Sequence, residues 1–160
     1  MYQKIMVPMD GSELAECVIP HVTAVADGLN PSNVVLVRVV EPYSVPYNDN
    51  VDLSFKVIEL EKKAENSVDQ QHFTEAADYL DGIAAGLQVK GTVEKVVLLG
   101  KPADALVDYA AQHGVDLVVI STHGRSGIKR WLRGSVAERI LQSICAPVFM
   151  VRAPGCTIGL

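Results

Sequence analysis

The segment NVVLVRVV, at residues 33–40, decides the fold class. Apolar residues occupy both alternating sets of positions, so both faces of this segment would be apolar if it were extended. A strand with one face in water alternates apolar and polar residues, whereas a nearly continuous run of valine and leucine is typical of a parallel sheet covered on both faces. The segment therefore predicts a layered α/β fold with this strand inside it.

Four more apolar runs lie outward from this one, and we interpret each as a strand. They are KIMV (4–7), TVEKVVLL (92–99), DLVVIS (116–121) and APVFMVR (146–152). Helical patterns separate them, and five strands are too few for an eightfold barrel. We predict a single domain, residues 1–160, of the α/β class: a doubly wound five-stranded parallel sheet with helices on both faces, which is a Rossmann-like α/β sandwich.

The helical patterns have recognisable starts and one internal conflict. Helices are expected at about residues 12–29, 54–87, 102–114 and 135–144. Ser12 has a side chain suited to an N-cap, and Pro102 suits a first helical turn. Pro20 lies inside the first pattern, where proline removes a hydrogen bond and clashes with the preceding turn, so we expect a kink. The stretch EPYSVPYNDN (41–50) is expected to be a loop.

Composition and charge exclude several classes of protein. The chain is 49% hydrophobic and 21% charged, as in folded globular proteins, and its net charge of −5 disfavours a general nucleic-acid surface. It lacks a signal-peptide core and any apolar run long enough to span a bilayer, so we expect a cytoplasmic protein without a membrane partner. Its three cysteines and four histidines are scattered, so no protein-built metal site is predicted.

The segment STHGRSGIKRWLRGSVAERIL, at 121–141, combines glycine with positive charge in an acidic chain. It follows a predicted strand end, where ligands bind in doubly wound sheets. Glycines let backbone N–H groups approach an anion, and Ser135 opens a helix whose first N–H groups are unpaired. We predict a phosphate site here; the alternative is turn glycines and solvated charges. The spacing differs from the Walker pattern and from GxGxxG, which disfavours a P-loop hydrolase and a dinucleotide dehydrogenase.

Six segments carry a family resemblance. They are KIMVPMDGSE (4–13), LVRVVEP (36–42), GKPADALVDYA (100–110), DLVVISTHGRSG (116–127), RGSVAERIL (133–141) and APVFMV (146–151). Taken in this order, they make the chain resemble the universal stress protein family over nearly its whole length. The resemblance implies a five-stranded parallel α/β sandwich and a homodimer paired through the final strand, Val148 to Arg152. A short apolar edge strand also invites such pairing on physical grounds.

One branch of that family binds ATP through the pattern GxxGx₉G[ST]. Gly124, Gly134 and Ser135 match its last positions, with nine residues between the two glycines. Ser121 stands where the pattern has its first glycine, which is a departure. Serine is small, so we expect that a ribose can still approach closely at this strand end.

The implied ATP site also uses other strand ends. The resemblance implies that Asp10 hydrogen-bonds the nucleoside and that the backbone at Val39 meets the adenine; the alternative for Asp10 is a turn and cap role. Arg125 is the basic side chain that we favour for the phosphates. The full predicted set is Pro8, Met9, Asp10, Val39, Gly100, Ser121, His123, Gly124, Arg125, Gly134, Ser135 and Val136.

A phosphate site is not by itself catalytic. Hydrolysis needs a positioned water or base and usually a metal, and neither a carboxylate cluster nor a Ser-His-Asp arrangement is evident in the sequence. His123 lies beside the predicted site, but we do not favour it as an acid or base. We expect an ATP-binding or adenine-nucleotide-binding regulatory or stress-response protein with at most slow hydrolysis and Mg²⁺ carried by the nucleotide. The alternatives are a nucleotide-independent homodimeric interaction or scaffold protein, a slow ATPase, and a binder of AMP or a cyclic nucleotide.

Overall fold

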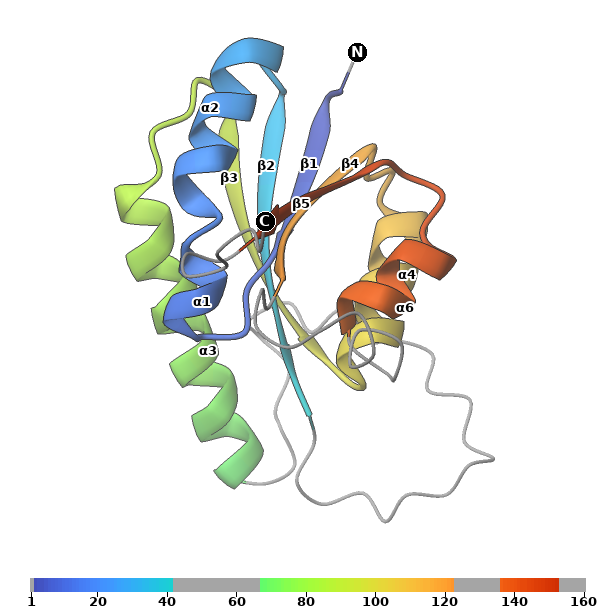
Figure 1. Cartoon of the computed structure of the whole chain (residues 1–160). Coiled ribbons are helices and arrows are strands. Elements are labelled where there is room, and N and C mark those ends of the chain that lie inside the picture. Colours follow the sequence, from blue (N-terminus) through green and yellow to red (C-terminus); the bar gives the residue numbers. More distant parts are fainter. Residues whose placement is uncertain (1, 42–66, 123–135, 153–160) are drawn as a thin grey trace, which may run out of the picture.

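The computed structural model describes residues 2–41, 67–122 and 136–152 of the chain. Its strands are β1 (Lys4–Pro8), β2 (Asn33–Val40), β3 (Thr92–Leu99), β4 (Leu117–Thr122) and β5 (Val148–Arg152). They form one five-stranded sheet in the order β3-β2-β1-β4-β5, and every neighbouring pair is parallel (Figure 1). All five predicted strands are confirmed, with boundaries that differ by at most two residues.

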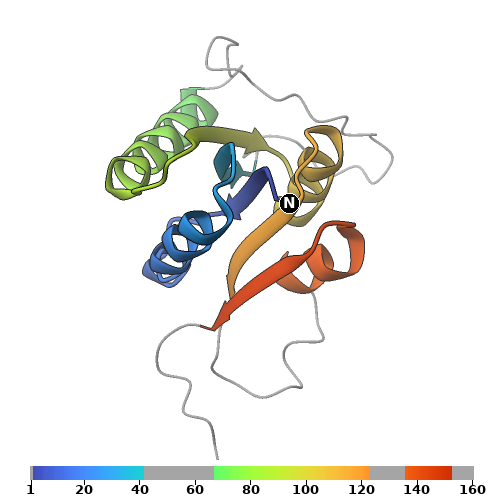
Figure 2. The same ribbon diagram turned by 90° about the horizontal axis from the view of Figure 1, so that it is seen from above.

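Helices cover both faces of the sheet, as the sequence predicts. They are α1 (Glu13–Glu16), α2 (Ile19–Leu29), α3 (Ser67–Gly86), α4 (Pro102–Gln112) and α6 (Val136–Ser143). Seen from above, α1, α2 and α3 lie on one side of the sheet and α4 and α6 on the other (Figure 2). No helix in the described part of the chain combines the length and apolar character needed to cross a membrane. The expected helical residues 54–66 and 135, and most of the expected loop at 41–50, lie outside the described residues.

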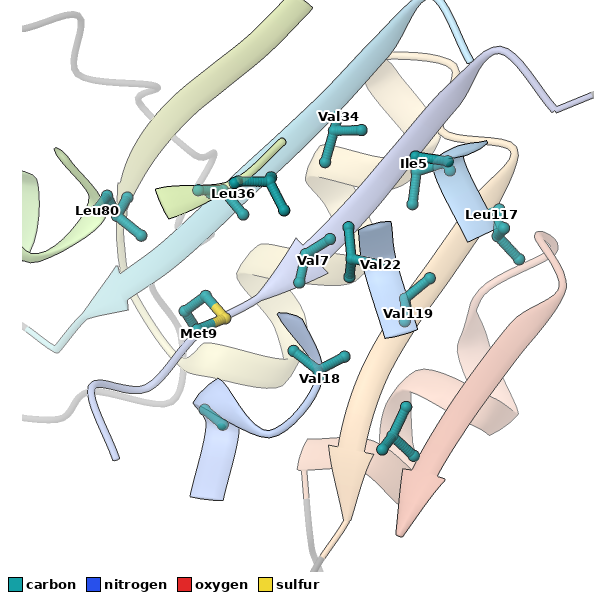
Figure 3. Close-up of a cluster of buried hydrophobic side chains, with 14 of the residues drawn as sticks. Ile5, Val7, Met9, Val18, Val22, Val34, Leu36, Leu80, Leu117 and Val119 are labelled. Carbon is teal, nitrogen blue, oxygen red and sulfur yellow. The ribbon is translucent and has the colours of Figure 1, made fainter. Parts of the chain in front are cut away.

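The side chains of β2 explain why both faces are covered. Val34 and Leu36 pack in the core layer beneath α1, α2 and α3 (Figure 3), whereas Val35 and Val37 pack in the layer beneath α4 and α6. All four side chains are completely buried. Each such burial is worth roughly 1.5–3 kcal/mol, so a strand that is apolar on both faces is stable only between two helical layers.

The first predicted helix is corrected to two helices. α1 ends at Glu16 and α2 begins at Ile19, and Cys17 and Val18 between them form a turn that keeps right-handed helical backbone angles. Pro20 stands in the first turn of α2, where its missing N–H costs nothing because the first N–H groups of a helix have no internal partner. The predicted cap is confirmed, since the Ala15 N–H donates to Oγ of Ser12 across 3.1 Å.

The winding of the sheet reverses between β1 and β4. Later strands are added outward from this pair, β2 and β3 on one side and β5 on the other. Among the described residues, the ladder that joins β1 to β4 ends at Met6 and Val118, although both strands continue further. The reversal places the carboxyl ends of β1 and β4 where ligands bind in doubly wound sheets.

Candidate functional site

The chain that leaves β1 supplies the first part of the candidate site. Pro8 is buried at the end of the strand, and Met9 follows it with only 3% of its surface exposed. The Met9 N–H donates to the carbonyl oxygen of Val37 across 2.8 Å, and its side chain packs among the residues labelled in Figure 3, near Val18. Met9 is therefore a core residue, and its side chain anchors the start of the turn that follows.

Asp10, Gly11 and Ser12 form that turn. Oδ1 of Asp10 accepts hydrogen bonds from the Ser12 N–H at 2.9 Å and from the Ser12 hydroxyl at 2.6 Å. Gly11 has φ = 86°, a conformation that L side chains rarely adopt. The turn role weighed for Asp10 in the sequence is thus present. Asp10 is also exposed, and both hydrogen bonds from Ser12 go to Oδ1, so the carboxylate keeps acceptor capacity toward a ligand.

The ends of β2 and β3 meet at the carboxyl edge of the sheet, the edge that also carries this turn. The Gly100 N–H donates to the carbonyl oxygen of Val40 across 3.0 Å, and Gly100 is buried with φ = 144°. A backbone in that region strains any residue with a Cβ, so glycine is required for this exit from β3. Val39 pairs with Leu98 in the ladder and packs against the core layer beneath α4 and α6. Both predicted residues lie at the carboxyl edge of the sheet.

Ser121 lies near the end of β4 and is half-buried. It pairs with Val151 on β5. The last pair that joins β1 to β4 is Met6 with Val118. Met9 and Ser121 each lie three residues beyond that pair, in the same direction along the sheet. α1, which follows the Asp10 turn, also contacts β4. The structure therefore brings Ser121 to the same edge of the sheet as the turn.

The far side of the candidate phosphate loop begins at Val136, the first residue of α6, which packs half-buried against the α4 layer. An ion pair holds the beginnings of these two helices together, because Nη2 of Arg139 lies 2.8 Å from Oδ1 of Asp104. Both side chains are substantially exposed, so the pair contributes orientation more than stability. The remaining predicted residues, His123, Gly124, Arg125, Gly134 and Ser135, lie outside the described residues.

Sequence reasoning missed a charged cluster beneath the Asp10 turn. Arg38, the one charged residue of β2, has its Cζ 4.9 Å from the ring centre of Tyr79 on α3. Burial raises the pKa of the Tyr79 hydroxyl above its ordinary range, and the Glu16 and Asp10 carboxylates raise it further, whereas Arg38 acts in the opposite direction. That hydroxyl is shielded from water and has no partner of normal hydrogen-bond geometry within the described residues. A lone arginine in an otherwise apolar strand was the available signal.

The described residues offer no protein-built metal centre. Across residues 2–41, 67–122 and 136–152, no group of three or more histidine, cysteine, aspartate or glutamate side chains is placed to hold an ion. At the carboxyl edge of the sheet the described residues present one exposed carboxylate, backbone groups at the ends of parallel strands and a helix that begins at Val136.

Comparison with known proteins gives consistent matches. The sequence profile of the universal stress protein family matches residues 1–152. Universal stress protein MJ0577 of Methanocaldococcus jannaschii is 31% identical over 156 residues, which cover 95% of this chain and 96% of that protein. The solved structure of MJ0577 superposes with a TM-score of 0.72 at 28% identity, covering 97% of this chain and 99% of the other.

Two further solved structures contain nucleotides. A universal stress protein in complex with cAMP superposes with a TM-score of 0.65 at 20% identity, covering 94% of this chain and 97% of the other. A universal stress protein family protein of Arabidopsis thaliana with AMP bound superposes with a TM-score of 0.58 at 14% identity, covering 96% and 93%. At these identities the likeness shows a shared fold, and it confirms the α/β architecture.

Proposed function

The chain belongs to the universal stress protein family, and from this premise we propose that it is a regulatory protein that binds ATP at the carboxyl edge of β1 and β4. Binding, with at most slow hydrolysis, is the proposed activity. In this proposal Mg²⁺ arrives with the nucleotide phosphates. The cytoplasmic location expected from the sequence stays a prediction.

One observation carries the proposal. The exposed carboxylate of Asp10 lies at the reversal of the sheet, where the β1–β4 ladder ends early and Ser121 approaches from β4. A polar acceptor at such a reversal suits the hydroxyl or amino groups of a nucleoside. Relatives of the same fold solved with cAMP and AMP support an adenine nucleotide as the ligand class.

The phosphates would lie toward the start of α6. Gly124, Gly134 and Ser135 retain the family's phosphate pattern, and Val136 begins the helix whose first N–H groups favour an anion. Arg125 is the proposed side-chain contact. In this assignment Asp10 and the backbone near Val39 select the nucleoside, while residues 124–136 bind its phosphates.

We also propose that the protein forms a homodimer through β5. β5 is an edge strand of the sheet, and Phe149 on it is one of two large hydrophobic residues exposed in the described chain. An apolar edge strand that pairs with its own copy across a twofold axis hides both the free backbone groups and the exposed ring. Nucleotide ordering of the segment between β4 and α6 would then change the surface that the dimer presents to other proteins.

Two observations favour a second candidate, a homodimeric interaction protein that binds no nucleotide. Oδ1 of Asp10 is already engaged by Ser12, and Ser121 replaces the first glycine of the ATP pattern. In this candidate the strand-end residues serve only to build the turn, and dimer contacts provide the function.

The test uses protein purified without added nucleotide. The protein is denatured, the released small molecules are separated by chromatography, and stripped protein is titrated calorimetrically with ATP, AMP, cAMP and adenosine, with and without Mg²⁺. ATP binding with a dissociation constant in the micromolar range or lower supports the proposal. Preference for AMP or cAMP would reassign the ligand, and no binding of any of the four would leave the interaction protein as the function.

A further inference from the structure

We propose that Arg38 is a positioning residue for nucleoside binding: its guanidinium, held between Gly11 and Tyr79, fixes the turn that presents Asp10. This inference rests on the proposed function, because it names a residue that acts on the ligand through Asp10. Arg38 comes from β2, Gly11 from the β1–α1 turn and Tyr79 from α3, so three segments distant in sequence meet at one side chain.

The flat face of the guanidinium lies against Gly11. A Cβ on Gly11 would meet Nη2, Cζ and Nη1 of Arg38 at 2.9, 3.0 and 3.2 Å. The central carbon is as near as the two nitrogens, so that position lies over the face of the group and not beyond its hydrogen-bonding edge. Gly11 therefore supplies two things here, the positive φ of the turn and the empty space that the guanidinium occupies.

The other support of the guanidinium is the ring of Tyr79. Cζ of Arg38 lies 4.9 Å from the ring centre, within the range of a cation–π contact. Both residues are half-buried, and Tyr79 packs against the core beneath α3. β2 is an interior strand and α3 packs on it, so the strand and the helix that carry Arg38 and Tyr79 are fixed relative to each other. The Gly11 turn packs against the guanidinium that they hold in place.

The surrounding charges fit this role. Within the described residues Arg38 makes no ion pair at 4.0 Å or less, whereas the Asp10 and Glu16 carboxylates both act on the Tyr79 hydroxyl that it neighbours. Arg38 is therefore held by its contacts with Gly11 and Tyr79 and not by a close ion pair. Asp10 is not drawn into an ion pair with Arg38, and it stays exposed.

The experiment compares Arg38→Met with the wild type in two independent measurements. Methionine keeps an unbranched side chain next to Tyr79 but removes the charge and the flat face. The first measurement is amide hydrogen exchange of Ser12, whose N–H is bonded to Asp10 in the intact turn. We expect exchange about tenfold faster in Arg38→Met, corresponding to a loosened local structure. Unchanged exchange would overturn the positioning role, whether or not the protein binds nucleotide.

The second measurement is affinity for adenosine and, separately, for inorganic tripolyphosphate. Arg38→Met should weaken adenosine binding by about tenfold, a coupling typical of contacting residues, and leave tripolyphosphate binding unchanged. In an Asp10→Ala background the same substitution should have little further effect, because Arg38 acts through Asp10. Equal losses in both backgrounds would contradict the inference.

Two variants serve as controls. Lys95→Met removes a cation from β3 that pairs with Asp81 on the surface, and it should alter neither measurement. Arg38→Lys keeps the charge without the flat face, so it should restore neither the wild-type exchange rate of the Ser12 amide nor the wild-type affinity for adenosine. Full recovery of both would overturn the stacking argument. A wild type that binds neither ATP nor adenosine refutes the proposed function and the binding role of Arg38 together, whereas one that binds ATP but not adenosine refutes the binding role of Arg38 alone. A wild type that binds adenosine no more tightly than Arg38→Met does refutes the inference alone.

Discussion

The Ser12 hydroxyl donates a 2.6 Å hydrogen bond to Oδ1 of Asp10, the carboxylate proposed to receive the nucleoside. Ser12 at the same time caps α1 by accepting from the Ala15 N–H at 3.1 Å. The start of α1 and the orientation of the proposed ligand group are therefore determined by the same few atoms. A change at either residue is expected to be visible both in stability and in binding.

Replacing Asp10 separates its two roles. Asp10→Ala removes the acceptor for two hydrogen bonds at an exposed turn, and should lower the free energy of unfolding by about 1 kcal/mol while leaving the fold intact. It should weaken adenosine, AMP and ATP binding alike, since the carboxylate is proposed to contact the nucleoside. Asp10→Asn keeps a turn acceptor and should recover most of the stability. Urea unfolding and calorimetric titration measure the two effects; unaltered affinity for all three ligands would leave Asp10 a turn residue only.

Gly11→Ala tests the turn geometry directly. A Cβ at φ = 86° is strained, and it would also displace the Arg38 guanidinium, so we expect a loss of about 1–2 kcal/mol in unfolding free energy. Gly28→Ala is the matched control, because Gly28 lies in α2 and a Cβ added there would have nothing within 4 Å. That variant should gain about 0.5–1 kcal/mol, as alanine suits a helix interior better. Equal effects at the two glycines would argue against the turn as described.

Gly134→Asp tests the phosphate assignment. The substitution adds bulk and negative charge where backbone N–H groups are proposed to face the phosphates, so ATP binding should fall below detection. Gly82→Asp is the control for charge, since Gly82 lies in α3 and faces open space. It should leave ATP affinity unchanged. Wild-type affinity in Gly134→Asp, measured by calorimetry, would remove this loop from the site.

Stability should fall at high pH, in part through Tyr79. Burial and the Glu16 carboxylate raise the pKa of this hydroxyl in the fold, so its contribution is complete below the unfolded value near 10 and is lost above it. Above about pH 10 the unfolding free energy of the wild type should decrease more steeply than that of Tyr79→Phe. Tyr109, whose pKa is also raised by burial, keeps a residual slope in that variant. Identical slopes in wild type and variant would contradict the assignment.

The proposed dimer depends on the exposed face of β5. Phe149→Glu places a charge on the edge strand and should convert a dimer to a monomer in light scattering at micromolar concentration. Leu141→Glu on α6 is the matched control: Leu141 and Phe149 have 42% and 43% of their surfaces exposed, but Leu141 is not on the edge strand. It should stay dimeric. A monomeric wild type would refute the proposal outright.

Much of the fold follows from local patterns. The apolar runs and the helix signals at Ser12 and Pro102 predict the elements because each depends on neighbours within one or two turns of chain. The error at Pro20 has the same origin: the spacing of apolar residues continues across it, but the first turn of a new helix tolerates proline better than a helix interior does. The pattern therefore located the helical residues and an irregularity near Pro20, but it did not predict the division into two helices.

The sequence by itself determined the alternation of strands and helices, the two-faced burial of β2 and the strand ends at which the candidate residues stand. These follow from side-chain chemistry and periodicity, which are properties of contiguous chain. Only the tertiary structure decided that the guanidinium of Arg38 lies close to both Gly11 of the Asp10 turn and the ring of Tyr79. That arrangement depends on contacts among a strand, a turn and a helix that are far apart in sequence, and no local pattern records which side chains will share a space once the layers have packed.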